Sequence, residues 1–329
     1  MTVTYLRGVD NWSVAPATEH DYPLIADFLA TTPGLGGRKF AADSRDVAEQ
    51  LGGAFPGAAT VARDGSGRVR GYASLNRPHG VEPELFAEFA LDPAAPQDLA
   101  DAVVAFVLDR FAAESTAIPD SFFRTIVSTA QQAVIDALLR RGAAEEGQFI
   151  RTRKPLHDED AGLLAGAAIP GVTVIGWPEV IARDLGEQVR RLQFDTFLEH
   201  FGNMSKTPEL WEHHIRSRSF APDFSVAALD ETGSVIGYVL GSLFTAGVAP
   251  AEERSAHTDY IGVRADQRRR GIAELLLKRI WLAALHRGLT VASLGTDIHN
   301  RTNAHVLYHR LGYRAVEHSS AYRIDGAAR

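Results

Sequence analysis

The sequence predicts a fold of mixed strands and helices, α+β or α/β, that is built twice in tandem. Three observations lead to this prediction: the length, a repeated order of strand and helix patterns, and two landmarks that recur at similar intervals. At 329 residues the chain exceeds the size at which one hydrophobic core usually stops growing, so two domains are expected. Apolar residues make up 45% of the chain, which is enough to fill two cores.

The first landmark is a hairpin. Residues 59–75 are predicted to form a strand, an Asp-Gly-Ser-Gly turn and a second strand, and residues 225–243 repeat this plan around Asp-Glu-Thr-Gly. Val-Arg-Gly-Tyr at 69–72 matches Val-Ile-Gly-Tyr at 235–238, which lies 166 residues later. The Val-x-Gly-Tyr segment therefore marks the same position in two copies of one domain.

The second landmark is the end of a helix. Ala-Leu-Leu-Arg-Arg-Gly ends at Gly142, and Leu-Tyr-His-Arg-Leu-Gly ends at Gly312, 170 residues later. Hairpins and helix ends of this kind also arise by chance. Because the two intervals are nearly equal, they favour a duplication over chance similarity.

Each half has the same order of predicted elements: a strand, one or two helices, a hairpin, a strand, a helix, a strand, a helix and final strands. In the first half these elements are expected at 11–16, 19–31, 44–51, 59–75, 84–91, 96–114, 122–127, 129–141 and 145–153. In the second half they are expected at 172–176, 184–201, 208–216, 224–243, 255–263, 271–286, 290–297, 300–311 and 313–324.

The segment between the halves is rich in Gly, Pro and Ala, which is typical of a linker. We therefore expect a first domain at 1–155, a linker at 156–171 and a second domain at 172–329.

The charge and the cysteine content exclude several classes of function. The net charge of −7 argues against a general nucleic-acid or anionic-membrane binder, since such surfaces need clustered Lys and Arg. The absence of cysteine excludes disulfides, thiolate metal sites and a cysteine nucleophile. Residues 1–20 contain no signal-peptide pattern, and no run of apolar residues is long enough for a spanning helix. We expect a cytoplasmic protein without membrane or nucleic-acid partners.

One basic loop stands out from this acidic background. A strand pattern ends at Val263, the loop carries Arg268, Arg269 and Arg270, and Gly271 opens a helix with apolar periodicity. The N-terminus of a helix exposes unpaired N–H groups, glycine allows close approach, and arginines add charge-assisted hydrogen bonds. This layout predicts a site for a pyrophosphate. The alternative is a solvated basic loop.

Two signatures resemble the general N-acetyltransferase (GNAT) superfamily. Arg268-x-x-Gly271-x-Ala273 is similar to its acyl-CoA loop, Gln/Arg-x-x-Gly-x-Gly/Ala, and residues 300–313 are similar to its Asn…Ala-x-x-Leu-Tyr-x-x-x-Gly-Phe helix. The resemblance implies two tandem α+β domains, each with a mixed, mostly antiparallel central sheet flanked by helices. Tandem domains of this kind resemble mycothiol synthase and acetyltransferases encoded with actinobacterial antibiotic pathways.

The resemblance also implies acetyl-CoA as the co-substrate and a set of residues that bind it. These are Ile261, Gly262, Val263, Arg268, Arg269, Arg270, Gly271, Ile272 and Ala273. An asparagine joins them, but its identity stays open between Asn300 and Asn303. The family's asparagine lies seven residues before the tyrosine, whereas Asn300 lies eight before Tyr308.

In the family, the tyrosine of the second signature protonates the departing thiolate, and the matching residue is Tyr308. The alternative is a tyrosine that only packs. Strand alternation places His257 and Asp259 on one face with Ile261 and Val263, and one of the first two is the expected base. His257 ranks first because an unperturbed histidine pKa of about 6.5 suits a base at neutral pH.

The acceptor wall is expected from the helices after the first strand of the second domain, with His200 and Trp211 as candidates. No metal site is expected, because the histidines lack suitable ligand spacing. In the first half, residues 92–97 contain neither arginine nor glycine, and Leu138 stands at the position of Tyr308. The first domain is therefore expected to be a degenerate copy.

Together these observations predict an N-acetyltransferase that moves an acetyl group from acetyl-CoA to a primary amine of a small molecule. A protein or peptide amine is the alternative acceptor. A non-catalytic CoA-binding module, or a catalytic first domain, would be a different interpretation of the same chain. The sequence predicts no oligomeric state.

Overall fold

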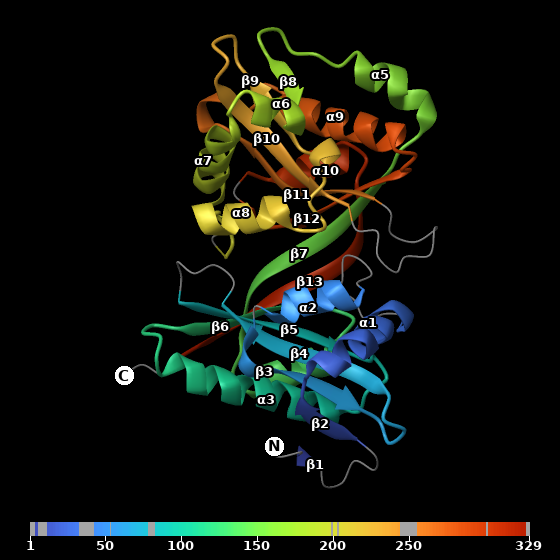
Figure 1. Ribbon diagram of the computed structural model, residues 1–329, viewed down its shortest axis with the longest axis vertical. Helices are drawn as coiled ribbons and strands as arrows, with labels where there is room; N and C mark the ends of the chain where they lie inside the picture. The colour runs from blue at the N-terminus through green and yellow to red at the C-terminus, as the bar shows by residue number, and fades with distance from the viewer. Residues whose placement is uncertain are drawn as a thin grey trace. The chain divides into compact units, whose positions relative to one another are not determined.

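The computed structural model describes residues 4–5, 12–32, 43–52, 54–77, 83–198, 200–202, 204–243, 255–300 and 302–326, and these form two compact units (Figure 1). The first unit contains the described residues up to Phe149 and from Glu317 onward. The second contains those from Ile150 to Val316. The predicted element ranges include residues 11, 199 and 301, which lie outside the described residues.

The first unit is a mostly antiparallel sheet with helices on both faces (Figure 1). Its elements are β1 (Thr4–Tyr5), β2 (Ser13–Pro16), α1 (Tyr22–Thr31), α2 (Ser44–Gly52), β3 (Ala54–Arg63), β4 (Val69–Asn76), β5 (Glu84–Leu91), α3 (Gln97–Ser115), β6 (Phe122–Ser128), α4 (Gln132–Arg140) and the start of β7 (Ala144–Pro155). The strand order is β1-β2-β3-β4-β5-β6-β13, and β5 and β6 run parallel.

The second unit repeats this plan. Its elements are the end of β7, α5 (Ala161–Ala165), β8 (Thr173–Gly176), α6 (Trp177–Ala182), α7 (Gly186–Phe197), α8 (Pro208–Arg216), β9 (Val226–Leu229), β10 (Val235–Ser242), β11 (Ala256–Val263), α9 (Ile272–His286), β12 (Val291–Asp297), α10 (Ala304–Arg310) and the start of β13 (Arg314–Asp325). The strand order is β8-β9-β10-β11-β12-β7, and β11 and β12 run parallel.

Matching hydrogen bonds support the predicted duplication. The Asp92 N–H donates to the carbonyl of Arg70 (2.8 Å), as the Arg264 N–H does to that of Ile236 (2.9 Å). After the last helix of each copy, the N–H of Ala143 donates to Leu138 (3.1 Å) and that of Tyr313 to Tyr308 (3.0 Å). Leu138 therefore does occupy the position of Tyr308.

Each sheet separates two hydrophobic clusters. In the first unit, α1 and α2 cover one face and α3 and α4 the other. In the second unit, α9, α10 and α5 pack on one face, which we call the α9 face. The opposite face, which we call the α7 face, is covered by α6, α7 and α8. The predicted periodicity of α9 is confirmed, since Leu275, Leu276, Ile280 and Ala284 are buried.

The last strand differs from the expected domain boundary. Residues 319–325 of β13 pair antiparallel with β6, from Ser319↔Ser128 to Asp325↔Phe122, and Tyr322 is buried in the core of the first unit. The chain thus returns to the first sheet after completing the second unit's α10. Strand periodicity at 313–324 identifies a strand but not the sheet that receives it, because pairing is a long-range choice.

The segment expected to be a linker is folded. It contains α5, and Leu156 and Leu164 are buried in the α9-face cluster. The guanidinium of Arg279 donates hydrogen bonds to the carbonyls of Ala165 (3.2 Å) and Ala167 (3.0 Å). Gly, Pro and Ala are compatible with a packed short helix, so a prediction from composition alone overestimates the flexibility of this segment.

We predict that Tyr322→Ala lowers the free energy of unfolding of the first unit by about 3 kcal/mol, because it removes a buried aromatic side chain from that core. Chemical denaturation measures the change. Val316→Ala, on the exposed start of the same strand, serves as the control and is expected to change stability by less than about 0.5 kcal/mol. Equal effects of the two substitutions would contradict the packing of β13 in the first unit.

Candidate functional site

The second sheet opens where its two parallel strands part. Pairs between β11 and β12 run only from Ala256↔Ala292 to Thr258↔Leu294. From 260 to 263, β11 pairs with β10, and from 259 to 263 it has no paired residue on β12 among the described residues. Unpaired backbone groups on such an edge can bind an extended ligand by strand addition.

The alternation of the ladder shows which backbone groups face this opening. The Arg264 N–H donates to Ile236 of β10, and antiparallel hydrogen-bonded pairs recur at every second residue. The backbone groups of Gly262 therefore point toward β10, and those of Ile261 and Val263 toward the opening. Of the three backbone amides expected to contact acetyl-CoA, those of Ile261 and Val263 thus face the opening and that of Gly262 faces β10.

Gly262 is required by packing. A Cβ at this position would lie 2.5 Å from Cε1 of Tyr238 and 2.6 Å from Oγ1 of Thr196. The hydroxyls of these two residues are hydrogen-bonded to each other at 3.0 Å, and burial raises the pKa of the Tyr238 phenol. The glycine thus lets α7 approach the sheet beside the opening.

The first unit contains the same opening but fills it with its own side chain. Pairs between β5 and β6 stop at Ala87↔Thr125. Beyond that point the Leu91 N–H donates to Oε1 of Gln131 (3.0 Å), and Nε2 of Gln131 donates to the carbonyl of Phe89 (3.4 Å). Phe89 and Leu91 correspond to Ile261 and Val263. The buried Gln131 therefore occupies the backbone groups that the second unit leaves open.

The basic loop has the predicted strand, loop and helix. A short 3-10 turn, Ala265–Gln267, follows β11, and Gly271 caps α9 with a left-handed φ of +82°. Arg269 is also left-handed, with φ +63°. The Leu275 N–H donates to the Gly271 carbonyl (3.0 Å) and so begins the i→i−4 pattern of the helix, which leaves the preceding N–H groups at the helix start for an anion.

The three arginines of the loop are exposed and only partly engaged. Nε of Arg268 donates to the carbonyl of Val263 (3.1 Å), and Arg270 donates to the side chain of Gln267. The Arg269 guanidinium makes no hydrogen bond or ion pair within the described part of the chain. Charge and free donors are therefore available where the helix begins.

The neighbouring Arg264 is engaged within the fold instead. It pairs with Asp266 at 2.7 Å and lies 3.7 Å from Asp230 of the hairpin turn. Asp92 stands at the corresponding position of the first unit, so the charge there is reversed. Asp92 receives a hydrogen bond from Ala94 N (2.8 Å) and pairs with Arg70 (3.0 Å).

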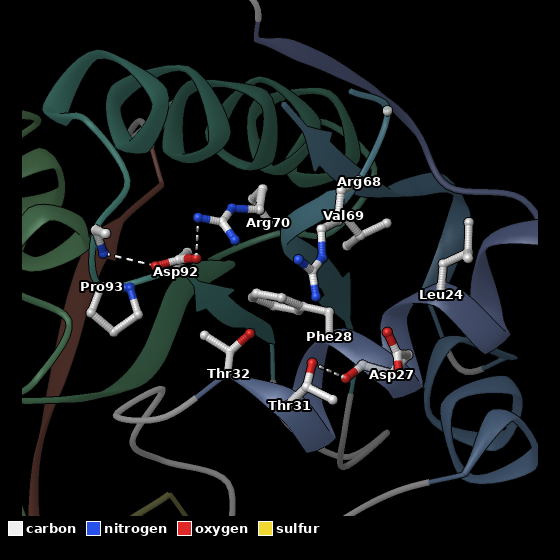
Figure 2. A pocket seen from close by; sticks show the side chains of 12 residues that line it. Leu24, Asp27, Phe28, Thr31, Thr32, Arg68, Val69, Arg70, Asp92 and Pro93 are labelled. Carbon is white, nitrogen blue, oxygen red and sulfur yellow. Dashed lines mark hydrogen bonds and ion pairs between the residues drawn. The ribbon is translucent and has the colours of Figure 1, made fainter. Parts of the chain in front are cut away.

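Figure 2 shows the cavity beside this loop of the first unit, with a volume of about 490 Å³. Thr31 at the end of α1 and the following Thr32 form one wall, and Arg68 and Arg70 of the hairpin form another. Arg70 forms an ion pair with Asp92 of this loop. The loop has no glycine before the start of α3. The cavity thus lies where an acyl-CoA loop would be, without the residues of that signature.

Two tyrosines lie next to each other on the α9 face, with ring centroids 5.9 Å apart. Tyr313 accepts a hydrogen bond from Nε1 of Trp281 (2.9 Å), so its hydroxyl serves packing. The Tyr308 hydroxyl makes no hydrogen bond among the described residues, and it is not one of the fully enclosed unpaired polar atoms. Burial raises the pKa of the Tyr308 phenol, which keeps it protonated at neutral pH.

The two asparagines have different environments. Oδ1 of Asn300 accepts hydrogen bonds from the N–H and the hydroxyl of Thr302, both at 2.8 Å, and so closes a turn. Asn303 is the left-handed N-cap residue of α10, with φ +52°, and its side chain makes no capping bond. Within the described residues, the side-chain amide of Asn303 therefore remains available for another partner, whereas that of Asn300 is partly used by the turn.

A β-bulge interrupts β11. Leu240 pairs with Tyr260, but Gly241 pairs with Thr258, so Asp259 is an extra residue with no partner of its own on β10. A bulge of this kind shifts the alternation of side chains by one residue.

The common face predicted for His257, Asp259, Ile261 and Val263 is therefore not formed. Ile261 and Val263 pack on the α9 face, whereas Asp259 lies near His214 of α8, on the α7 face. The prediction assumed an uninterrupted strand across 257–263. The bulge could not be predicted from this segment alone, because it depends on how β11 pairs with its partner strand.

His257 and Asp259 are close to each other on the α7 face. The His257 side chain is 1% exposed, and its Nδ1 is hydrogen-bonded to the hydroxyl of Ser293 at 2.9 Å. Its Nε2 lies 3.8 Å from Oδ1 of Asp259, whose side chain is 17% exposed. The hydroxyl of Ser242 is hydrogen-bonded to the same carboxylate. Of the two predicted bases, Asp259 is the more accessible.

His214 is a site residue that the sequence analysis did not select. Its Nε2 lies 3.9 Å from Oδ2 of Asp259, and that nitrogen is buried without a hydrogen bond among the described residues. Burial, assisted by the charges of Lys206 and His213, lowers the pKa of His214 to about 3, so the imidazole is neutral. The sequence did offer a signal for this position. His214 lies three residues after the buried Trp211, so both side chains are expected on the same, inward face of a helix.

The two proposed acceptor-wall residues are both on this side of the sheet. Trp211 is buried and packs against Trp177, with ring centroids 6.0 Å apart, which is a core role. His200 stacks on Phe197 at 4.9 Å. Burial lowers the pKa of His200, while a bond to the Phe201 carbonyl and the charge of Asp297 oppose this shift.

Among the residues that the structure describes, no cluster of His, Asp or Glu side chains has the arrangement of a metal site. Within the same residues, no helix combines the length and apolar character needed to span a membrane.

Comparison with known proteins agrees with this geometry. Residues 187–313, from the start of α7 to Tyr313, match the acetyltransferase (GNAT) family. This range lies within the second unit and contains the opened strands, the basic loop and Tyr308. The second unit is thus a GNAT acetyltransferase domain, the class of acyl-CoA-dependent enzyme that the two signatures predicted.

Solved structures match the whole chain. A GCN5-related N-acetyltransferase from Sphaerobacter thermophilus is 20% identical with a TM-score of 0.71, and the match covers 97% of this chain and 98% of that chain. A tandem GNAT protein from the clavulanic acid biosynthesis pathway is 16% identical with a TM-score of 0.67, covering 97% and 99%. These likenesses confirm the predicted tandem α+β fold. No curated protein sequence matches the chain.

We predict that Gly262→Ala lowers the free energy of unfolding by about 2 kcal/mol, because its Cβ would overlap Tyr238 and Thr196 beside the opening. Urea denaturation followed by tryptophan fluorescence measures the loss. Gly186→Ala is the matched control, since a Cβ at that start of α7 meets nothing within 4 Å. A Gly262→Ala protein as stable as the control would disprove the close approach of α7.

Proposed function

We propose that the second unit transfers the acetyl group of acetyl-CoA to a primary amine of a small molecule. The observation that carries this proposal is the opening between β11 and β12. It connects the basic start of α9 with the backbone of Ile261 and Val263, and it lies beside the bulged Asp259. A nucleotide-linked thioester and an amine can thus meet within one sheet.

The phosphates of acetyl-CoA would bind at the start of α9. The amides of Gly271, Ile272 and Ala273 and the arginines Arg268, Arg269 and Arg270 supply N–H donors and positive charge there. The pantetheine arm would then continue along β11, where the N–H groups of Ile261 and Val263 face the opening. Asn303, with its free amide, is the preferred asparagine partner for this arm.

The acceptor amine would approach from the α7 face, where Asp259 is accessible and His257 and His214 lie within 4 Å of its carboxylate. In the reaction, the amine nitrogen bonds to the thioester carbon and the carbon–sulfur bond breaks. The proton lost by the amine passes to Asp259, and His257 lies behind this carboxylate as a second acceptor.

Tyr308 would act on the departing sulfur. Its hydroxyl has no other hydrogen bond within the described chain, and its raised pKa keeps the proton in place until charge develops on the thiolate. Donation of this hydrogen bond stabilises the leaving group in the transition state. The reaction then yields an acetamide and CoA.

The first unit would not carry out this reaction. Leu138 replaces the acid, Asp92 replaces an arginine, and Gln131 occupies the strand opening. The test is a crystal structure of the full chain with CoA, together with thiol release over a panel of amines. Binding without thiol release would favour a non-catalytic CoA-binding module, and CoA in the first unit would reverse the assignment of the active copy. Turnover of peptide amines alone would favour the alternative acceptor.

We predict that Arg269→Ala weakens CoA binding about fivefold at low salt, because it removes an exposed cation with no internal partner. The loss shrinks as salt increases, since ions screen exposed charges. Calorimetry at two salt concentrations measures it. Arg191→Ala, which removes an exposed arginine paired with Glu187 on α7, is the control and should leave the affinity unchanged. An unchanged affinity in Arg269→Ala would remove this side chain from the site.

We predict that Tyr308→Phe lowers kcat about a hundredfold and leaves the affinity for acetyl-CoA nearly unchanged, because the hydroxyl acts only on the departing thiolate. Steady-state thiol release and calorimetry separate the two quantities. Tyr313→Phe is the matched control. It breaks the bond from Trp281, so it should cost about 1 kcal/mol of stability without a comparable loss of kcat. Parallel losses of affinity and kcat in Tyr308→Phe would contradict the acid role.

A further inference from the structure

A lysine without an ion pair lies beside the acceptor face of the second unit. Lys206 belongs to the segment between α7 and α8, and the buried Gln193 of α7 holds this segment in place. Oε1 of Gln193 accepts a hydrogen bond from the Lys206 N–H (2.7 Å), and its Nε2 donates to the carbonyl of Met204 (2.9 Å). The hydroxyl of Ser205 donates to the Phe194 carbonyl (2.8 Å). The backbone of Lys206 is therefore fixed.

The side chain of Lys206 reaches the aromatic ring next to the candidate base. Its Nζ lies 5.1 Å from the ring centroid of Tyr260, the residue that follows Asp259. The imidazole of His214 packs edge-on against the same ring, with centroids 5.2 Å apart. The ammonium forms no ion pair with any described residue. One aromatic ring thus has a free cation on it and a neutral imidazole against it.

The carboxylate of Asp259 lies 3.9 Å from Nε2 of this imidazole. That nitrogen is buried and has no hydrogen bond within the described chain. Buried polar atoms are nearly always satisfied, so an unsatisfied one next to a carboxylate indicates a missing partner. In the tautomer that carries its proton on Nδ1, the neutral imidazole presents Nε2 as an acceptor, as the carboxylate presents its oxygens, and two such acceptors suit an ammonium donor.

We propose that the acceptor of the second unit is a zwitterionic amine, that is, a primary amine that also carries a carboxylate. Its amine would lie between Asp259 and His214, and its carboxylate would pair with Lys206. This inference rests on the proposed function and adds the class of substrate. A plain alkylamine would leave Lys206 without a counter-charge.

The test is the binding of matched pairs of amines to the full chain saturated with CoA, measured by calorimetry. Glycine, β-alanine, γ-aminobutyrate and phenylalanine are compared with methylamine, ethylamine, propylamine and phenethylamine, which differ only in lacking the carboxylate. In at least one pair, the carboxylated member should bind about tenfold more tightly, the gain typical of a charge-assisted hydrogen bond.

Lys206→Met should abolish that preference and leave the affinity for the alkylamines unchanged. Lys278→Met is the control, since Lys278 of α9 is paired with Glu274 at 2.8 Å, and it should keep the preference. Lys206→Met should also keep nearly the melting temperature of the parent, because a single cation–π contact contributes only about 1 kcal/mol.

A chain that binds no compound of the panel, that binds both members of every pair equally, or that keeps the preference in Lys206→Met would overturn the proposal. Thiol release measured in parallel tests the proposed function separately. A zwitterion that binds through Lys206 without release of CoA would contradict the transferase function alone. Turnover of amines without any preference for the carboxylate would contradict only the substrate class.

Discussion

The parting of β11 and β12 after Thr258 and Leu294 is the constraint on which the site depends. A sheet normally satisfies its backbone groups within itself, because an unpaired buried N–H or C=O is costly. In the second unit, the N–H groups of Ile261 and Val263 face the opening and have no strand partner on β12 among the described residues. The basic start of α9 lies at one end of this opening. The other residues of the candidate site, such as Asp259 and Tyr308, are described by their position relative to this opening.

The two copies show how little is needed to close such an opening. In the first unit, the single side chain of Gln131 bonds to both Leu91 and Phe89. The charge at the start of the following loop is reversed as well. Asp92 stands at the position of Arg264 and pairs with Arg70. The fold is kept while the groups that bind a ligand are satisfied internally. The last strand, β13, also ends in the sheet of this first unit, where it pairs with β6.

Residues of the same type differ in burial and in hydrogen bonding in the second unit. Tyr313 and Tyr308 are neighbours, but only the former has its hydroxyl bonded to Trp281. His257 is enclosed and bonded to Ser293, whereas His214 is neutral with an unsatisfied nitrogen near Asp259. Sequence reasoning ranked His257 first from its ordinary pKa. Asp259 is the more accessible of the two side chains, and a base must be reachable as well as basic.

The sequence by itself determined the features that depend on neighbours along the chain. Hairpin turns, the periodicity of α9, the arginines before Gly271 and the spacing around Tyr308 are local patterns, and they predicted the tandem fold and the acyl-CoA signature. Only the tertiary structure decided the sheet that receives β13, the bulge at Asp259, the filling of the first opening by Gln131 and the approach of His214 and Lys206 to Tyr260. Each of these depends on a partner far away in the chain, and one extra residue in a strand is enough to move every following side chain to the other face.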